Sequence, residues 1–174
     1  FHSWTPPKAA FDAADVVGMY LQPELPTFWN GFDSLDLAHR DYAINEGFQL
    51  CKNYGNSPSF TMLSLGNEFG GSTSVVHQIV DTLKKQDARH LYAQGTNALN
   101  GWKGYFDLDD YWTIVRNKVE NPDHSTEVRV SYGFNDSKNG GMINDWSPST
   151  TYSFDKALEG VDIPTISHET GQFQ

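Results

Sequence analysis

Short apolar segments alternate with longer amphipathic ones along this chain, and this alternation limits the fold more than any other feature. The longer segments show helical spacing, as in Val76, Val80 and Leu83. We predict helices at residues 8–17, 34–54, 73–87 and 152–158, and strands at residues 19–22, 60–65, 90–93, 111–115, 127–132 and 163–167. Strands that alternate with helices form βαβ units and parallel sheets, so the sequence predicts the α/β class.

Polar side chains gather where the predicted strands end. They are Glu24, Asn67, Glu68, Gln94, Asp109, Asp110, His168 and Glu169. No glycine-rich dinucleotide fingerprint follows a predicted strand, which disfavours a doubly wound nucleotide-binding sheet. In a (β/α)8 TIM barrel, functional residues come from the carboxyl ends of several strands. The pattern therefore favours a TIM barrel.

The chain is too short for a whole barrel. It has 174 residues, whereas a full barrel takes about 250, or about 31 for each βα unit. Glu68 and Glu169 are 169 − 68 = 101 residues apart, which corresponds to three units of about 34 residues. We expect residues 1–174 to form one incomplete barrel domain, approximately the second to seventh βα units. The remaining units and any β-sandwich domains are expected outside this chain.

The charge of the chain limits its partners. The formal net charge is −10 and the sequence pI is about 4.8, with no cluster of Lys or Arg. Nucleic acid and anionic membrane surfaces are therefore poor partners. The longest apolar run is also too short to cross a bilayer.

Few residues qualify as metal ligands. Cys51 is the single cysteine, which is expected to exclude both an internal disulfide framework and a cysteine-based metal site. His39, His77 and His90 are expected on helix surfaces or helix ends, and their spacing to carboxylates predicts no metal site.

Two strand-end glutamates suit one reaction. A retaining glycosidase needs a carboxyl group that protonates the leaving oxygen and a second, about 5 Å away, that attacks the anomeric carbon. Glu68 and Glu169 both follow short apolar strands. Two carboxylates at that separation repel each other, so one stays protonated near neutral pH, as the acid role requires.

Two motifs carry a family resemblance. The segment from Leu65 to Glu68, together with Ser167, His168 and Glu169, resembles the clan of retaining glycosidases that includes β-galactosidases. The closer resemblance is to the catalytic TIM barrel of glycoside hydrolase family 2. It rests on residues 2–7 (HSWTPP) and on residues 53–59 (NYGNSPS), where Ser57 stands in place of the usual His. The resemblance covers residues 1 to about 112 and 163–174.

The resemblance implies a role for each of several residues. Glu68 would be the general acid/base, Glu169 the nucleophile, and Asn67 the partner of the sugar 2-hydroxyl. Further substrate-lining residues would be His2, Trp4, Glu24, Trp29, Asp110, Trp112, Tyr132 and His168, because carboxylates bind sugar hydroxyls and aromatic rings stack on pyranose C–H faces. Tyr132 would alternatively hydrogen-bond the nucleophile.

The implied activity is hydrolysis of a terminal β-glycosidic bond by double displacement, as in β-galactosidases. Two alternatives stay open: an endo-acting glycosidase of the same clan, and a sugar-binding barrel without catalysis. The family's active-site arginine and eighth-strand tryptophan fall outside these residues, so the chain alone is expected to be inactive. Expected partners are a carbohydrate and the rest of its own chain, and a homo-oligomer stays open. No organic cofactor is expected, a structural or activating divalent cation stays open, and a periplasmic or extracellular location is favoured over the cytoplasm.

Overall fold

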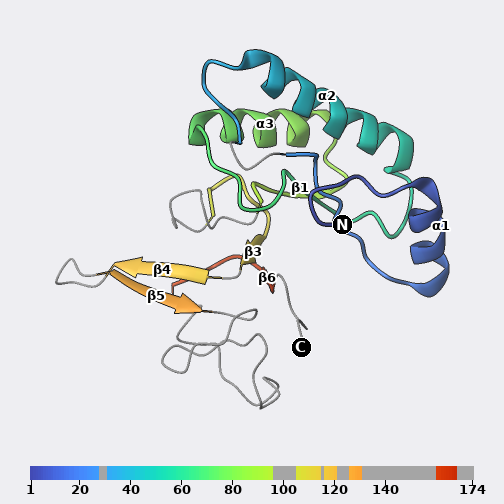
Figure 1. Cartoon of the computed structure of the whole chain (residues 1–174). Coiled ribbons are helices and arrows are strands. Elements are labelled where there is room, and N and C mark those ends of the chain that lie inside the picture. Colours follow the sequence, from blue (N-terminus) through green and yellow to red (C-terminus); the bar gives the residue numbers. More distant parts are fainter. Residues whose placement is uncertain (28–30, 96–104, 115, 121–125, 131–159, 168–174) are drawn as a thin grey trace, which may run out of the picture.

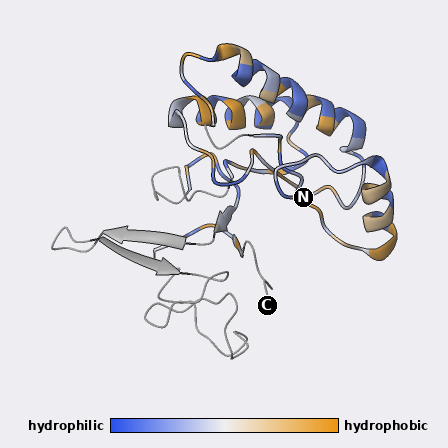
Figure 2. Ribbon diagram, in the orientation of Figure 1, coloured by the Kyte–Doolittle hydropathy of each residue, from blue (hydrophilic) through white to orange (hydrophobic). Residues whose placement is uncertain are grey.

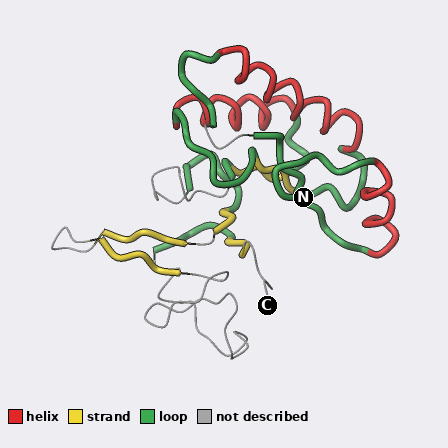
Figure 3. Tube along the Cα trace, in the orientation of Figure 1, coloured by secondary structure: helices red, strands yellow, loops and turns green. Residues whose placement is uncertain are grey.

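The computed structural model describes residues 1–27, 31–95, 105–114, 116–120, 126–130 and 160–167. Its helices are α1 (Lys8–Val17), α2 (Leu37–Tyr54) and α3 (Thr73–Gln86) (Figure 1). Its strands are β1 (Met62–Ser64), β2 (Leu91–Ala93), β3 (Trp112–Ile114), β4 (Arg116–Glu120), β5 (Thr126–Val130) and β6 (Thr165–Ser167). The helices gather near β1, and β4 and β5 lie apart from them (Figure 3).

The three predicted helices in the described part of the chain are confirmed. Helix α1 begins after Pro7 and ends at Gly18, which has the left-handed φ of 73° common at helix ends. Helix α2 begins later than predicted, because the Asp36 carboxylate accepts a hydrogen bond from the backbone N–H of His39 at 2.9 Å and so caps the helix. The predicted helix at 152–158 lies outside the described residues.

A run of parallel neighbours forms the centre of the structure. Leu21 pairs with Phe60 and Glu24 pairs with Ser64, both in parallel isolated bridges. Strand β1 then pairs in parallel with β2, with Met62 opposite Leu91. The predicted strand at 19–22 is therefore wrong in extent. Pro23 and Pro26 have no N–H to donate, so this segment makes separate bridges instead of a continuous ladder.

The later strands pair in two ways. Strand β3 is parallel to β6, and the Asp110 N–H just before β3 donates to the Tyr92 carbonyl of β2 at 2.8 Å. Strands β4 and β5 form an antiparallel pair, which the prediction of parallel strands throughout missed. Only five residues separate β4 from β5, too few for the crossover connection that parallel strands need. The described strands make three two-stranded sheets, so a mixed helix and strand fold is observed, and the closed α/β barrel stays a prediction.

The core lies between the helices and the first strands. Helices α2 and α3 pack side by side over β1 and β2, and polar and apolar residues interleave along each helix (Figures 1 and 2). The largest fully buried aliphatic and aromatic side chains here are Phe11, Phe32, Leu63, Leu65, Phe69, Ile79, Leu83 and Tyr92. Each such side chain stabilises the fold by about 1.5–3 kcal/mol. Among the described helices, none has the length and apolar character needed to span a bilayer.

His90 follows one of two predictions. It lies directly before β2, at the start of the predicted strand at 90–93, but it is 6% exposed and so is not on the helix surface or helix end that was also expected. Its ring stacks on Phe60, with 4.2 Å between ring centroids. The ring is therefore part of the interior at the amino ends of β1 and β2.

Candidate active site

Three predicted site residues lie at one edge of the parallel strands. Asn67 and Glu68 follow β1 closely, and Glu24 stands opposite Ser64, the last residue of β1. Because parallel strands end at the same edge, these side chains start from neighbouring positions. The structure thus brings a carboxamide and two carboxylates to the carboxyl end of the central strands.

Asn67 carries an unusual buried acceptor. The residue is 8% exposed, and its Oδ1 has no hydrogen-bond partner in the part of the chain that the structure describes. An unsatisfied buried acceptor costs about 1–3 kcal/mol. A bound hydroxyl group that donates to Oδ1 would remove that cost. The atom therefore has the character of a ligand contact.

Backbone strain marks the same edge. Ser3 (φ 50°) and Glu68 (φ 46°) are the non-glycine residues with positive φ among those described. A left-handed φ at such residues costs about 1–3 kcal/mol and often occurs at functional sites. The Ser3 N–H donates to Oε2 of Glu24, so both strained residues belong to the region of Glu24 and Asn67.

His2 and Trp4, both predicted to line the substrate, flank Ser3 in the sequence. The Trp4 side chain is 68% exposed and leaves its ring open to a ligand, and His2 is also exposed. Both residues therefore start close to the Ser3 backbone that binds Glu24, and their substrate-lining role stays a prediction.

Two glycines shape the loops at this edge. Gly66 has φ 146°, and a Cβ there would lie 1.7 Å from Thr27 Oγ1. Gly95, which follows β2, has φ 127°, and its Cβ would lie 2.4 Å from the Gly66 carbonyl oxygen. The two loops therefore contact each other backbone to backbone. This close packing fixes the direction in which Asn67 and Glu68 leave β1.

Asp109 and Tyr111 are site neighbours that the sequence prediction did not select. Asp109 is buried, and its carboxylate accepts the backbone N–H groups of Gln94 at 2.9 Å and Phe106 at 2.8 Å. Burial nevertheless raises the pKa of Asp109 to about 6. Burial, with the negative charge of Glu24 next in size, raises the pKa of Tyr111 well above its ordinary value. The sequence shows Gln94 and Asp109 as polar residues near the ends of predicted strands, but it does not show that they are buried.

Asp110 and Trp112 depart from the predicted arrangement. Asp110 precedes β3, so its placement at the carboxyl end of a strand is wrong. Its carboxylate pairs with Lys84 Nζ at 2.8 Å and accepts the Tyr92 N–H at 2.9 Å, which ties α3 and β2 together. Trp112 is 1% exposed in β3, and its ring packs on Tyr105. A substrate contact for either residue stays a prediction.

Four predicted site residues, Trp29, Tyr132, His168 and Glu169, lie outside the described residues. Strand β6 ends at Ser167, immediately before His168 in the sequence. The separation between the Glu68 and Glu169 carboxylates therefore stays a prediction.

Comparisons with known proteins add information on the fold. No family model matches the sequence, and no curated protein matches it. A β-glucuronidase from an uncultured Clostridium species matches with a TM-score of 0.54 and 16% identity, over 66% of this chain and 22% of that protein. Bacteroides uniformis β-glucuronidase 2, covalently bound to cyclophellitol-6-carboxylate aziridine, matches with a TM-score of 0.52 and 15% identity. That match covers 64% of this chain and 15% of that protein.

The chain shares the fold of part of a β-glucuronidase. It spans less than a quarter of either neighbour, and identities this low show a common fold only. The similarity supports the resemblance to family 2 glycosidases at that level. The β-galactosidase specificity and the roles of single residues stay predictions.

Proposed function

We propose that this chain supplies the acid/base, Glu68, and the nucleophile, Glu169, of a retaining glycoside hydrolase that cleaves a terminal β-glycosidic bond. The observation that carries this proposal is the Asn67–Glu68 pair at the carboxyl end of β1, beside Glu24, on a β-glucuronidase-like fold. The left-handed backbone at Glu68 and the unpaired Oδ1 of Asn67 support it.

In the proposed mechanism, Glu68 gives its proton to the glycosidic oxygen while the Glu169 carboxylate attacks the anomeric carbon. The carbon–oxygen bond to the leaving group breaks, and a covalent glycosyl-enzyme forms. Glu68 then removes a proton from water, which attacks the same carbon and releases Glu169. Asn67 Oδ1, an acceptor without a partner in the described chain, would accept the sugar 2-hydroxyl hydrogen throughout.

The sugar is the finer part of the proposal. The sequence motifs resemble those of β-galactosidases, whereas both structural neighbours are β-glucuronidases. A panel of nitrophenyl β-galactoside, β-glucuronide and β-glucoside substrates separates these cases by kcat/KM. We propose a β-galactoside, and a preference for the glucuronide above tenfold would replace that choice without changing the reaction class.

The decisive test is the stereochemistry of the first product in the protein that contains this chain. An NMR time course should show the β-anomer first, followed by slow mutarotation. Glu169→Gln should abolish turnover, and Glu46→Gln on α2 serves as a matched control that should keep it. An inverted first product, or sugar binding without hydrolysis, would refute the retaining enzyme.

A further inference from the structure

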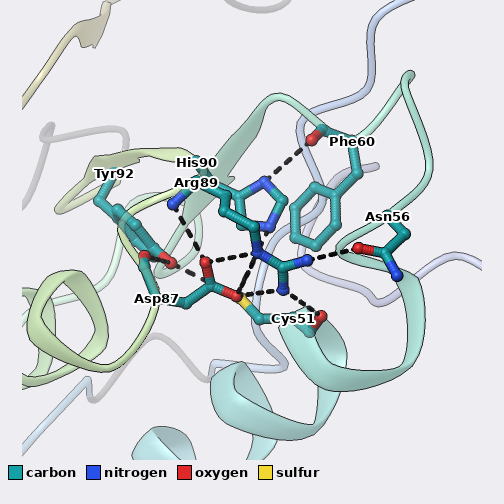
Figure 4. A network of polar contacts seen from close by, with 7 residues as sticks. All are labelled: Cys51, Asn56, Phe60, Asp87, Arg89, His90 and Tyr92. Atoms are coloured by element: carbon teal, nitrogen blue, oxygen red, sulfur yellow. Dashed lines mark hydrogen bonds and ion pairs between the residues drawn. The ribbon is translucent and has the colours of Figure 1, made fainter.

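A second cluster of polar groups lies at the opposite ends of β1 and β2. It joins Cys51 in the last turn of α2, Asp87 at the end of α3 and His90 before β2 (Figure 4). One ligand atom from each, the thiol sulfur, a carboxylate oxygen and a ring nitrogen, lie within 4.8 Å of one another. None of the three belongs to the proposed catalytic site.

The hydrogen bonding of His90 fixes which ring nitrogen is available. Its Nδ1 lies 2.9 Å from the Phe60 carbonyl oxygen, and a carbonyl only accepts, so Nδ1 carries hydrogen. The side chain is 2% exposed, and burial in the interior favours the uncharged ring. Nε2 therefore keeps its lone pair. A histidine that binds a metal through one ring nitrogen usually donates the N–H of the other nitrogen to a carbonyl or carboxylate oxygen.

Nε2 faces a second electron-rich group. It has no hydrogen-bond partner among the described residues, and the Asp87 carboxylate oxygen Oδ2 lies 3.9 Å away. The Arg89 guanidinium already balances the charge of this carboxylate, and a metal ion between Nε2 and Oδ2 would use the lone pair of Nε2 that has no partner among the described residues.

The sulfur of Cys51 is also available. Its nearest polar contact is the Tyr92 hydroxyl at 3.6 Å, and that hydroxyl donates its hydrogen to the Asp87 carbonyl at 2.7 Å. The thiol is therefore the donor toward Tyr92, and its lone pairs remain unused in this contact. The cluster thus offers one sulfur, one nitrogen and one oxygen ligand.

We propose that Cys51, Asp87 and His90 form a zinc site. Zn²⁺ prefers this mixture of thiolate, neutral imidazole and carboxylate, with Zn–S about 2.3 Å and Zn–N about 2.0 Å. In a tetrahedral site such donors lie about 3.3–3.6 Å apart, so the pair at 3.9 Å needs only a small approach. On binding, zinc replaces the thiol hydrogen, which leaves to solvent as a proton, and water takes the fourth position.

Arg89 is the competitor for this site. Its guanidinium binds the Asp87 carboxylate, with Nε 2.9 Å from Oδ1, and also donates to Asn56 Oδ1 at 2.6 Å (Figure 4). The Arg89 side chain is 49% exposed and so can move into solvent. Zinc must displace it from Asp87, and Arg89 therefore lowers the affinity of the site.

The test is a titration of chelator-treated protein with Co²⁺ and then Zn²⁺, followed by optical absorption and by metal content. One equivalent should bind, and the cobalt form should show a thiolate charge-transfer band. Cys51→Ser should remove that band. Both Cys51→Ser and His90→Gln should weaken zinc binding by at least about 100-fold, because each variant removes a metal ligand and the loss of a supporting hydrogen bond usually costs less. His77→Gln is the matched control, because His77 Nε2 also lacks a hydrogen-bond partner in the described structure but lies outside the cluster.

The Arg89→Gln variant sharpens the test without removing a ligand. It should bind zinc about tenfold more tightly, since a competing charge is lost. Equal zinc affinity in Cys51→Ser and wild type, or no zinc binding by protein with native circular dichroism, would overturn the proposal. If Cys51→Ser fails to fold, the cobalt spectrum of the wild type and the zinc affinity of Arg89→Gln still test the proposed zinc site.

Discussion

The two ends of the β1–β2 pair use polar residues in opposite ways. At the carboxyl end, Asn67 has a buried oxygen that no described residue hydrogen-bonds, and Glu68 has a left-handed backbone. At the amino end, Asp87 and Arg89 bind each other through several hydrogen bonds and hold Cys51 and Asn56 as well. One end therefore stores unfavourable energy, and the other end contributes favourable contacts.

This difference separates function from stability along the same strands. Strain and unpaired groups persist only where the surrounding structure over-determines them. The core under α2 and α3, together with the Arg89 contacts, provides that support. Substitutions of the Asn67 and Glu68 side chains at the carboxyl end should therefore change activity more than stability, and substitutions of the Asp87 and Arg89 side chains at the amino end should do the reverse.

The largest expected effect is on catalysis. Glu68→Ala should lower kcat by about 10²–10⁴-fold for substrates with poor leaving groups, the usual range for loss of general acid catalysis. Substrates with good leaving groups should be spared, and azide should restore turnover. The free energy of unfolding should change little, because Ala keeps the left-handed backbone and only a half-buried side chain is shortened. Equal losses with good and poor leaving groups would contradict the acid role.

The next effect is on the loop that carries Glu68. Gly66→Ala should lower the free energy of unfolding by about 3 kcal/mol, since the new Cβ would lie 1.7 Å from Thr27 Oγ1. Gly18→Ala is the matched control, because Gly18 also has positive φ but has nothing within 4 Å of its Cβ position. It should cost only about 1–2 kcal/mol. Similar losses in urea unfolding would show that the Gly66 loop is not tightly packed.

The third effect is on the pH dependence of the free energy of unfolding. The pKa of Asp109 is raised from 3.8 to about 6 in the folded protein, so its contribution to stability is complete below pH 3.8. This contribution is lost as the pH rises through about 6, and it amounts to roughly 2–3 kcal/mol because each pKa unit is worth about 1.4 kcal/mol. Asp109→Asn should flatten the decline in urea-unfolding free energy between these pH values.

The exposed neighbour Asp107 provides the control for this measurement. Asp107→Asn should leave the slope of stability against pH unchanged. An unchanged slope in Asp109→Asn would instead assign the pH dependence to other groups.

The smallest effect is expected at the amino end. Asp87→Asn should lower the free energy of unfolding by about 1–2 kcal/mol, less than for a fully buried pair because Arg89 is half exposed. Hydrolysis by the folded variant should be unchanged. Asp81→Asn, which breaks the exposed Lys85 pair, should cost less than about 0.5 kcal/mol. If Asp87→Asn lost activity while its stability stayed unchanged, the amino end of the strands would also contribute to hydrolysis.

Local signals in the sequence predicted much of this structure. Proline before α1, glycine after it and the apolar spacing in α3 are features of consecutive residues, and the helices follow them. The same holds for the position of Asn67 and Glu68 after a buried strand. Such features depend on backbone preferences and on burial of one face, which can be read along the chain.

Other features depend on partners distant in the sequence. The antiparallel pairing of β4 with β5, the burial of Asp109 and the stacking of His90 on Phe60 each require knowledge of which segments meet. The proximity of Cys51 to His90 is of the same kind. The sequence alone had argued against both residues as metal ligands. Spacing along the chain carries no information on these contacts.

The contact between Gly66 and Gly95 has an evolutionary consequence. A Cβ on Gly95 would lie 2.4 Å from the Gly66 carbonyl oxygen, so Gly95 cannot change unless the Gly66 loop shifts first, and a Cβ on Gly66 would in turn meet Thr27 Oγ1. Substitutions in the two loops are therefore epistatic. A lineage with this core would diversify through the outer parts of its loops, and the path of Asn67 and Glu68 away from β1 would be among its slowest features to change.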